Sequence, residues 1–188
     1  MRSLLLSAVV LSAPLLSACA TRAAPTDAFF SNLKSLCGQT LTGAVVSDQA
    51  VDADWRGEVL RVGPVACTDD TVRMALAVGA DMSREWVVER LGDDVRFLHY
   101  HTEPDGSPSA VTRYGGTAEP GGSATVQRFG TDAATRENFA ANGIARSIPN
   151  IWTLRVDPAG RTLAYSLERP ATATEDARDF RAEFTVAE

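Results

Sequence analysis

The chain has 188 residues, of which 18 are basic and 24 are acidic, giving a net charge of −6 at neutral pH. An acidic balance without a basic stripe argues against nucleic-acid binding. The length is that of one domain with a sizeable core. The sequence also lacks the GxSxG, P-loop, HExxH and CxxC motifs, which argues against the enzyme classes that depend on them.

The first 18 residues have the layout of a secretory signal. Arg2 precedes an apolar run over residues 4–16, and small residues follow it. This run is shorter than a comfortable membrane span. We therefore predict a signal peptide over residues 1–18, a polar tether over 19–25 and a single domain over 26–188.

The stretch Leu16-Ser17-Ala18-Cys19 resembles the lipobox of bacterial lipoproteins. The resemblance implies cleavage before Cys19, a diacylglycerol thioether on its sulfur and acylation of its amine. Several acyl chains anchor a protein stably to a membrane. Ala20 stands where inner-membrane lipoproteins carry aspartate, which favours the outer membrane, with the domain in the periplasm. The alternative is an ordinary cleaved signal with a chance cysteine.

Cys37 and Cys67 are the other two cysteines of the chain. Export places them in an oxidising compartment, where two remaining cysteines usually pair. We predict a structural disulfide between them. The alternatives are a redox-active thiol and a metal ligand.

Residues 26–38 have the pattern of a short amphipathic helix. Thr26 or Asp27 is a suitable N-cap, and Gly38 is suited to the C-terminal end. The expected buried face consists of Phe29, Phe30, Leu33, Leu36 and Cys37.

The rest of the chain is dominated by short alternating segments separated by turns. A second short helix is expected at residues 133–142, with Asp132 as its N-cap and Gly143 as its stop. Trp55, in DADWRGE, is interpreted as a plug at a barrel end or as an exposed contact. The expected strands are 40–47, 57–66, 71–79, 84–91, 95–100, 109–116, 123–129, 150–156, 162–168 and 179–186.

This pattern predicts a mainly β fold, an antiparallel meander barrel of about 8–10 strands, with a sandwich as the alternative. The order of elements is similar to the lipocalin or calycin layout, although CGQTLTG lacks the Gly-x-Trp of lipocalins. The pieces LCGQTLTG, DADWRGE, SREW, TRYGGT and PNIW resemble a group of small exported bacterial proteins of uncharacterised function. That resemblance implies export and a compact domain, and it brings no catalytic residues.

The hairpin over residues 84–101 contains His99 and His101, the only histidines of the chain. A two-residue loop at Gly92-Asp93 places Trp86 opposite His99 and Arg84 opposite His101. The face with Trp86, Val88, Val95, Phe97 and both histidines is the more apolar, so we expect it to point inward.

Three interpretations of the histidine pair remain open. They are polar side chains at a strand end, or part of a pocket with Arg84, Trp86 and Phe97, or two ligands of a metal that a carboxylate such as Asp105 completes.

The leading functional hypothesis is a lipid-anchored envelope protein that binds a small apolar ligand and is not an enzyme, with no cofactor. The alternatives are a structural or protein-interaction role and a metal-dependent enzyme that uses His99 and His101.

Overall fold

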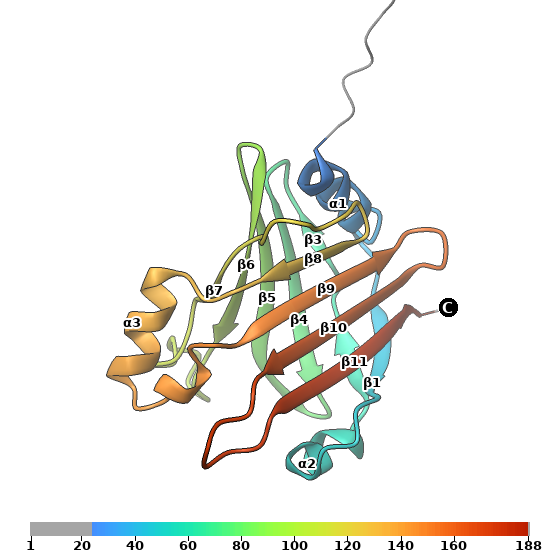
Figure 1. Ribbon diagram of the computed structural model, residues 1–188. Helices are drawn as coiled ribbons and strands as arrows, with labels where there is room; N and C mark the ends of the chain where they lie inside the picture. Colours follow the sequence, from blue (N-terminus) through green and yellow to red (C-terminus); the bar gives the residue numbers. More distant parts are fainter. Residues whose placement is uncertain (1–23, 188) are drawn as a thin grey trace, which may run out of the picture.

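The computed structural model describes residues 24–187, which form a nearly closed antiparallel barrel of ten strands (Figure 1). The predicted mainly β, antiparallel meander fold is confirmed. The strand order is β7-β6-β5-β4-β2-β1-β11-β10-β9-β8, and β3 pairs with β4 beside this path. The strands are β1 (Leu41–Val45), β2 (Leu60–Val62), β3 (Ala66–Cys67), β4 (Thr71–Val78), β5 (Asp81–Leu91), β6 (Asp94–His101), β7 (Tyr114–Thr117), β8 (Val126–Phe129), β9 (Ile151–Asp157), β10 (Thr162–Arg169) and β11 (Arg178–Val186).

The barrel closes in two different ways on its two sides. The first and last strands pair in regular register, with Leu41 opposite Val186. On the other side β7 and β8 share only an isolated bridge between Ala118 and Phe129. Gly116 permits this closure, because a Cβ at that position would lie 2.1 Å from the carbonyl oxygen of Gly130.

Helix α3 (Ala133–Ala141) packs against β7 at this side of the barrel. The side chain of Asp132 caps it by accepting a hydrogen bond from the Thr135 backbone N–H, as the sequence predicts. The Thr135 hydroxyl donates to the Gly115 carbonyl and accepts from the Gly115 N–H. It is the partner of the Gly115 N–H and a second donor to the Gly115 carbonyl, which also accepts from the Asp132 N–H.

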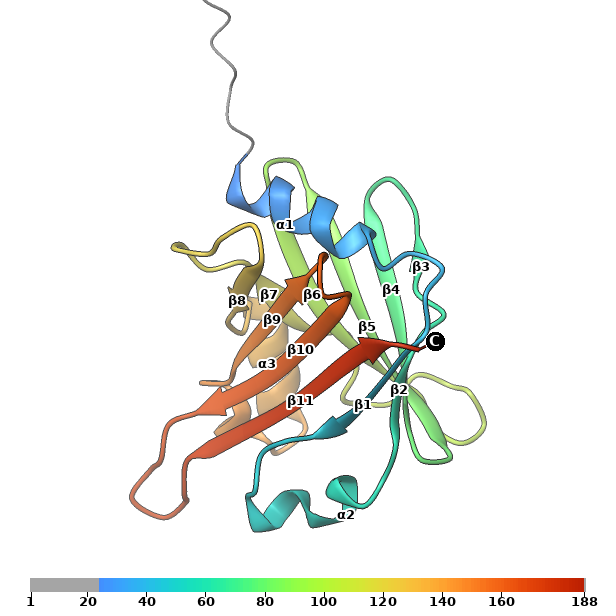
Figure 2. The same ribbon diagram turned by 90° about the vertical axis from the view of Figure 1, so that its right-hand side faces the viewer.

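Helix α1 (Pro25–Lys34) closes one end of the barrel, and the short helix α2 (Ala53–Arg56) lies at the opposite end (Figures 1 and 2). The predicted N-cap at Thr26 or Asp27 is wrong. The helix begins at Pro25 with Ala24 as its cap, since proline suits the first helical position, and the Thr26 hydroxyl donates to the Asp93 carbonyl instead. Within residues 24–187, no helix is both long enough and apolar enough to cross a bilayer.

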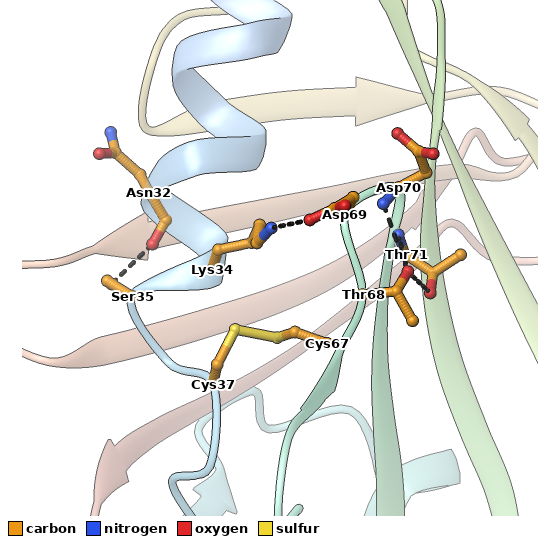
Figure 3. Close-up of a disulfide and its surroundings, with 9 residues drawn as sticks. All are labelled: Asn32, Lys34, Ser35, Cys37, Cys67, Thr68, Asp69, Asp70 and Thr71. Atoms are coloured by element: carbon orange, nitrogen blue, oxygen red, sulfur yellow. Dashed lines mark hydrogen bonds and ion pairs between the residues drawn. A yellow bond between two sulfur atoms is a disulfide. The ribbon is translucent and has the colours of Figure 1, made fainter.

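The predicted disulfide between Cys37 and Cys67 is present in the structure (Figure 3). It joins the chain just after α1 to β3, so the end cap is covalently attached to the wall. The Lys34 ammonium lies 4.0 Å from the Asp69 carboxylate in the same region.

Several predicted strands are shorter than expected, and in two of them a residue with positive φ interrupts the strand. Segment 57–66 is divided into β2 and β3 at Gly63-Pro64, where Gly63 has a φ of +109°. In segment 109–116 only residues from Tyr114 onward belong to a strand, because Arg113 takes a φ of +53°. A short 3₁₀ helix, η1 (Ala50–Asp52), and α2 form in a region where no helix was predicted.

The interior is filled densely near α1 and less so at the other end. Phe29, Phe30 and Leu33 of α1 are fully buried against the strands. Strand β11 alternates as predicted, with Phe180, Ala182 and Phe184 inside. The remaining space inside the barrel is at the end where η1 and α2 lie.

Candidate functional site

The β5–β6 hairpin has the register that the sequence predicts. Trp86 pairs with His99, Arg84 pairs with His101, and Glu89 pairs with Arg96. Trp86 and His99 are each only 4% exposed and point into the barrel. This pairing determines which side chains face the interior space.

That space is a cavity of about 350 Å³ at the α2 end of the barrel. Aromatic rings form most of its wall, and three charged side chains lie near its mouth. Strands β4 to β7, β10 and β11 and the η1–α2 segment all contribute. The lining residues are Val51, Asp52, Trp55, Leu76, Arg84, Trp86, His99, His101, Tyr114, Tyr165, Leu167, Arg178 and Phe180.

His99 is a buried, neutral histidine with a defined tautomer. Its Nδ1 lies 3.3 Å from the Tyr114 carbonyl oxygen, which only accepts, so Nδ1 carries the proton and donates. Its Nε2 lies 3.1 Å from the Tyr165 hydroxyl and therefore accepts from it. Burial lowers the pKa of His99 to about 3, because the charged form would lose its hydration.

Flat aromatic surfaces define the shape of the cavity. The rings of Trp86 and Tyr165 stack with centroids 4.5 Å apart and an interplanar angle of 11°. His99 stacks on Tyr114 at 4.8 Å and 7°. Burial also raises the pKa of the Tyr165 hydroxyl well above its ordinary value. These groups therefore remain neutral at physiological pH and offer ring faces and hydroxyl groups to a ligand.

His101 lies nearer the mouth than His99. Its Nε2 is 3.1 Å from the Tyr114 hydroxyl, whose pKa is raised to about 12 by burial. The pKa of His101 is lowered, first by burial and then by the positive charge of Arg84. Arg84 itself forms an ion pair with Asp81, and its guanidinium carbon lies 5.0 Å from the centre of the Trp55 ring.

The η1–α2 segment is held against the mouth by a buried ion pair between Asp52 and Arg178. Arg178 Nη1 donates to Asp52 Oδ2 at 2.8 Å, and its Nη2 donates to Oδ1. Arg178 Nη1 also donates to Gln49 Oε1 at 2.7 Å. Trp55 packs edge-on against Phe180 at 5.5 Å, so it partly plugs this end of the barrel, as one interpretation of the sequence proposed.

The structure brings together most of the residues that the sequence singled out. Arg84, Trp86, His99 and His101 all line the cavity. Phe97 was expected there as well, but it packs in the core behind His99, with ring centroids 4.5 Å apart and no exposed surface. Cys19 and the predicted signal peptide lie outside the described residues.

The sequence did not predict that residues of β10, β11 and the η1–α2 segment line the same cavity as the β5–β6 hairpin. Tyr165 and Phe180 come from β10 and β11, whose alternating patterns predict inward positions. They give no sign that Tyr165 stacks on Trp86 or that Phe180 packs edge-on against Tyr165. Asp52 and Arg178 are 126 residues apart, and nothing in the local sequence connects them.

The geometry of the histidine pair does not favour a metal centre. Within residues 24–187 no group of three or more histidine, cysteine, aspartate or glutamate side chains is arranged to hold a metal ion. Both ring nitrogens of His99 already have hydrogen-bond partners, and Asp105 is exposed and accepts from the backbone and side chain of Ser107.

Comparisons of the chain with protein-family models, with curated proteins and with solved structures find no match. The cavity is therefore interpreted from its own residues.

Proposed function

We propose that this protein is a binding module of the cell envelope that takes a small, mainly apolar ligand into the cavity beside Trp86. The observation that carries the proposal is a cavity of about 350 Å³ with aromatic walls at one end of the barrel. Ligand sites are typically concave, largely apolar and equipped with a few well-placed polar groups. The Tyr114 hydroxyl and the His101 ring are such groups here.

Aromatic walls favour such a ligand for two reasons. Burying apolar surface is worth roughly 25 cal/mol per Å². Offset or edge-on aromatic contacts add about 0.5–1.5 kcal/mol for each ring pair. Contacts with one another and with the core already fix the side chains of Trp86, Tyr165 and Phe180. They therefore lose little conformational entropy when a ligand binds.

We propose further that Cys19 anchors the module to the outer membrane. Helix α1, where the described residues begin, and helix α2 lie at opposite ends of the barrel (Figure 2). The η1–α2 segment lines the cavity, so the cavity is at the end away from α1. A domain tethered ahead of α1 would have its cavity mouth directed away from the anchoring surface. This arrangement suits a protein that captures its ligand from the periplasm.

The ligand proposal is tested with N-phenyl-1-naphthylamine, a neutral probe whose fluorescence rises in apolar surroundings. We expect saturable enhancement with the wild-type domain. Leu167→Trp fills part of the cavity and should weaken binding by about tenfold or more, which corresponds to 1.4 kcal/mol. Leu91→Trp is the matched control, because Leu91 is exposed at the other end of the hairpin. Equal enhancement in both variants would contradict the cavity as the binding site.

Anchoring is tested separately by metabolic labelling of the full chain with a radioactive fatty acid. We expect label in the wild type and none in Cys19→Ala. Label that persists in Cys19→Ala would contradict lipidation at this residue, whatever the result of the ligand experiment.

A second candidate function is protein interaction at the cavity mouth. Among the large apolar side chains exposed in the described part of the chain, Val46, Val51, Val59 and Met82 belong to segments at the α2 end. Crosslinking from a photoreactive residue at position 82 in intact cells tests this role. A discrete crosslinked protein would support it, and crosslinking no greater than that from position 91 would contradict it.

A further inference from the structure

We propose that the ligand carries an anionic group, in particular a carboxylate, which binds beside Arg84 at the mouth while a planar aromatic body fills the cavity. This inference rests on the proposed function and names the class of ligand. It follows from the charges that line the cavity and from the shape of its walls.

Of the three charged side chains that line the cavity, two neutralise each other. Arg178 and Asp52 form a two-pronged ion pair in which Asp52 is only 4% exposed. Such a pair contributes little net charge to a ligand next to it. Arg84, whose partner Asp81 lies outside the lining, is therefore the lining cation that can still accept a ligand anion.

The partner of Arg84 leaves half of the guanidinium group available. Asp81 lies outside the lining, is about half exposed and also accepts from the Ser83 N–H. Within residues 24–187 the hydrogen bonds of Arg84 start from Nη1, toward Asp81 and Ser83. Nε and Nη2 remain free for a planar, two-oxygen acceptor, which a carboxylate provides.

Arg84 is also placed over the cavity by packing. Its guanidinium lies on the Trp55 ring, which is itself part of the lining, and it pairs across the hairpin with His101. Trp86, which also lines the cavity, lies two residues further along β5. A carboxylate held there would point its attached ring toward Trp86 and Tyr165.

The shape of the cavity favours a flat body. Trp86 and Tyr165 stack on each other at 4.5 Å, so a ligand contacts the edges and outer faces of this pair, while Phe180 meets Tyr165 edge-on at 6.0 Å. A volume of about 350 Å³ is suited to one or two fused rings rather than to a long acyl chain. The chemistry of the site thus indicates a small aromatic carboxylate.

Because His101 is neutral at the cavity mouth, the affinity for a carboxylate should depend on pH. The groups that face it are Arg84, Asp81, His99 and Tyr114, and Arg84 is the one that opposes its protonation most among the charges. A bound carboxylate would offset Arg84 and raise the pKa of His101. By linkage, carboxylate affinity should increase as the pH falls toward the lowered pKa of His101.

The test compares 2-naphthoate with 2-naphthamide, which has the same shape and no charge, by calorimetric titration of the wild-type domain. We expect naphthoate to bind at least about tenfold more tightly, as one charge-assisted hydrogen-bonded pair provides. Arg84→Gln should remove this ratio and Arg84→Lys should retain part of it. Arg61→Gln, on the exposed face of β2, is the control and should leave the ratio unchanged.

The outcomes separate this inference from the proposed function. Equal affinities for the two probes, or tighter binding of the amide, would overturn the carboxylate inference while the cavity remains a binding site. Failure of both naphthyl compounds together with N-phenyl-1-naphthylamine would overturn the proposed function itself. If Arg84→Gln does not fold, the wild-type ratio decides the question, since it must fall with added salt.

Discussion

Acidification from pH 7 to pH 5 should lower the free energy of unfolding by about 2 kcal/mol through His99 alone. The pKa of His99 is about 3 in the folded protein and 6.5 in the unfolded chain. Because the folded value is depressed, the unfolded chain takes up the proton first. The contribution to stability is complete above pH 6.5 and is lost as the pH falls toward 3.

Few other groups change protonation between pH 7 and 5, which makes the prediction specific. The chain contains only two histidines, and carboxylates ordinarily titrate below pH 5. The pKa of Asp81 is lowered to about 2, so it stays charged. The pKa of His101 is also lowered, so it adds to the loss in the same direction.

The assay is urea unfolding of the domain at pH 7, 6 and 5, followed by circular dichroism. In His101→Gln, the free energy of unfolding should still fall by about 2 kcal/mol between pH 7 and pH 5, because His99 is unchanged. His99→Gln removes the titrating imidazole and should therefore remove most of the pH dependence. The glutamine amide still offers an acceptor for the Tyr165 hydroxyl and a donor for the Tyr114 carbonyl. Stability that stays constant or rises as the pH falls from 7 to 5 in the wild type would refute the assignment of His99 as a buried neutral side chain.

Two further predictions concern the frame that supports the cavity. Replacing Cys37 and Cys67 together with alanine should lower the free energy of unfolding by about 3–4 kcal/mol in the chain-entropy model, because the disulfide closes a loop with a sequence separation of 30. Urea unfolding measures this loss, and an unchanged midpoint would contradict it. Gly116→Ala should cost about 1–3 kcal/mol or prevent folding, because its Cβ would overlap a backbone oxygen. Gly57→Ala has open space and is the control, and equal midpoints for the two variants would contradict the close approach.

Local signals in the sequence were sufficient for the β5–β6 hairpin. The glycine turn and the opposite charges of Glu89 and Arg96 set its register, and an amphipathic strand has only one face that suits the core. The same holds for α3, whose N-cap and stop are both short-range features.

The cavity itself depends on contacts that local patterns do not contain. Tyr165 reaches Trp86 and His99 only after β10 and β5 are brought to facing sides of the barrel. The η1–α2 segment is fixed by Asp52 through its ion pair with Arg178, far along the chain. Phe97 points into the barrel, as its position on the strand predicts. Alternation does not indicate at which level along the barrel axis an inward side chain lies, so it could not show that Phe97 belongs to the packed core and not to the cavity wall.

The most direct test of the account is a crystal structure of the domain grown with N-phenyl-1-naphthylamine. The account predicts electron density for the probe inside the barrel, in contact with Trp86 and Tyr165, with α1 closing the other end. An interior filled by the protein's own side chains, or a probe bound only on the outer wall, would contradict the assignment of a ligand cavity.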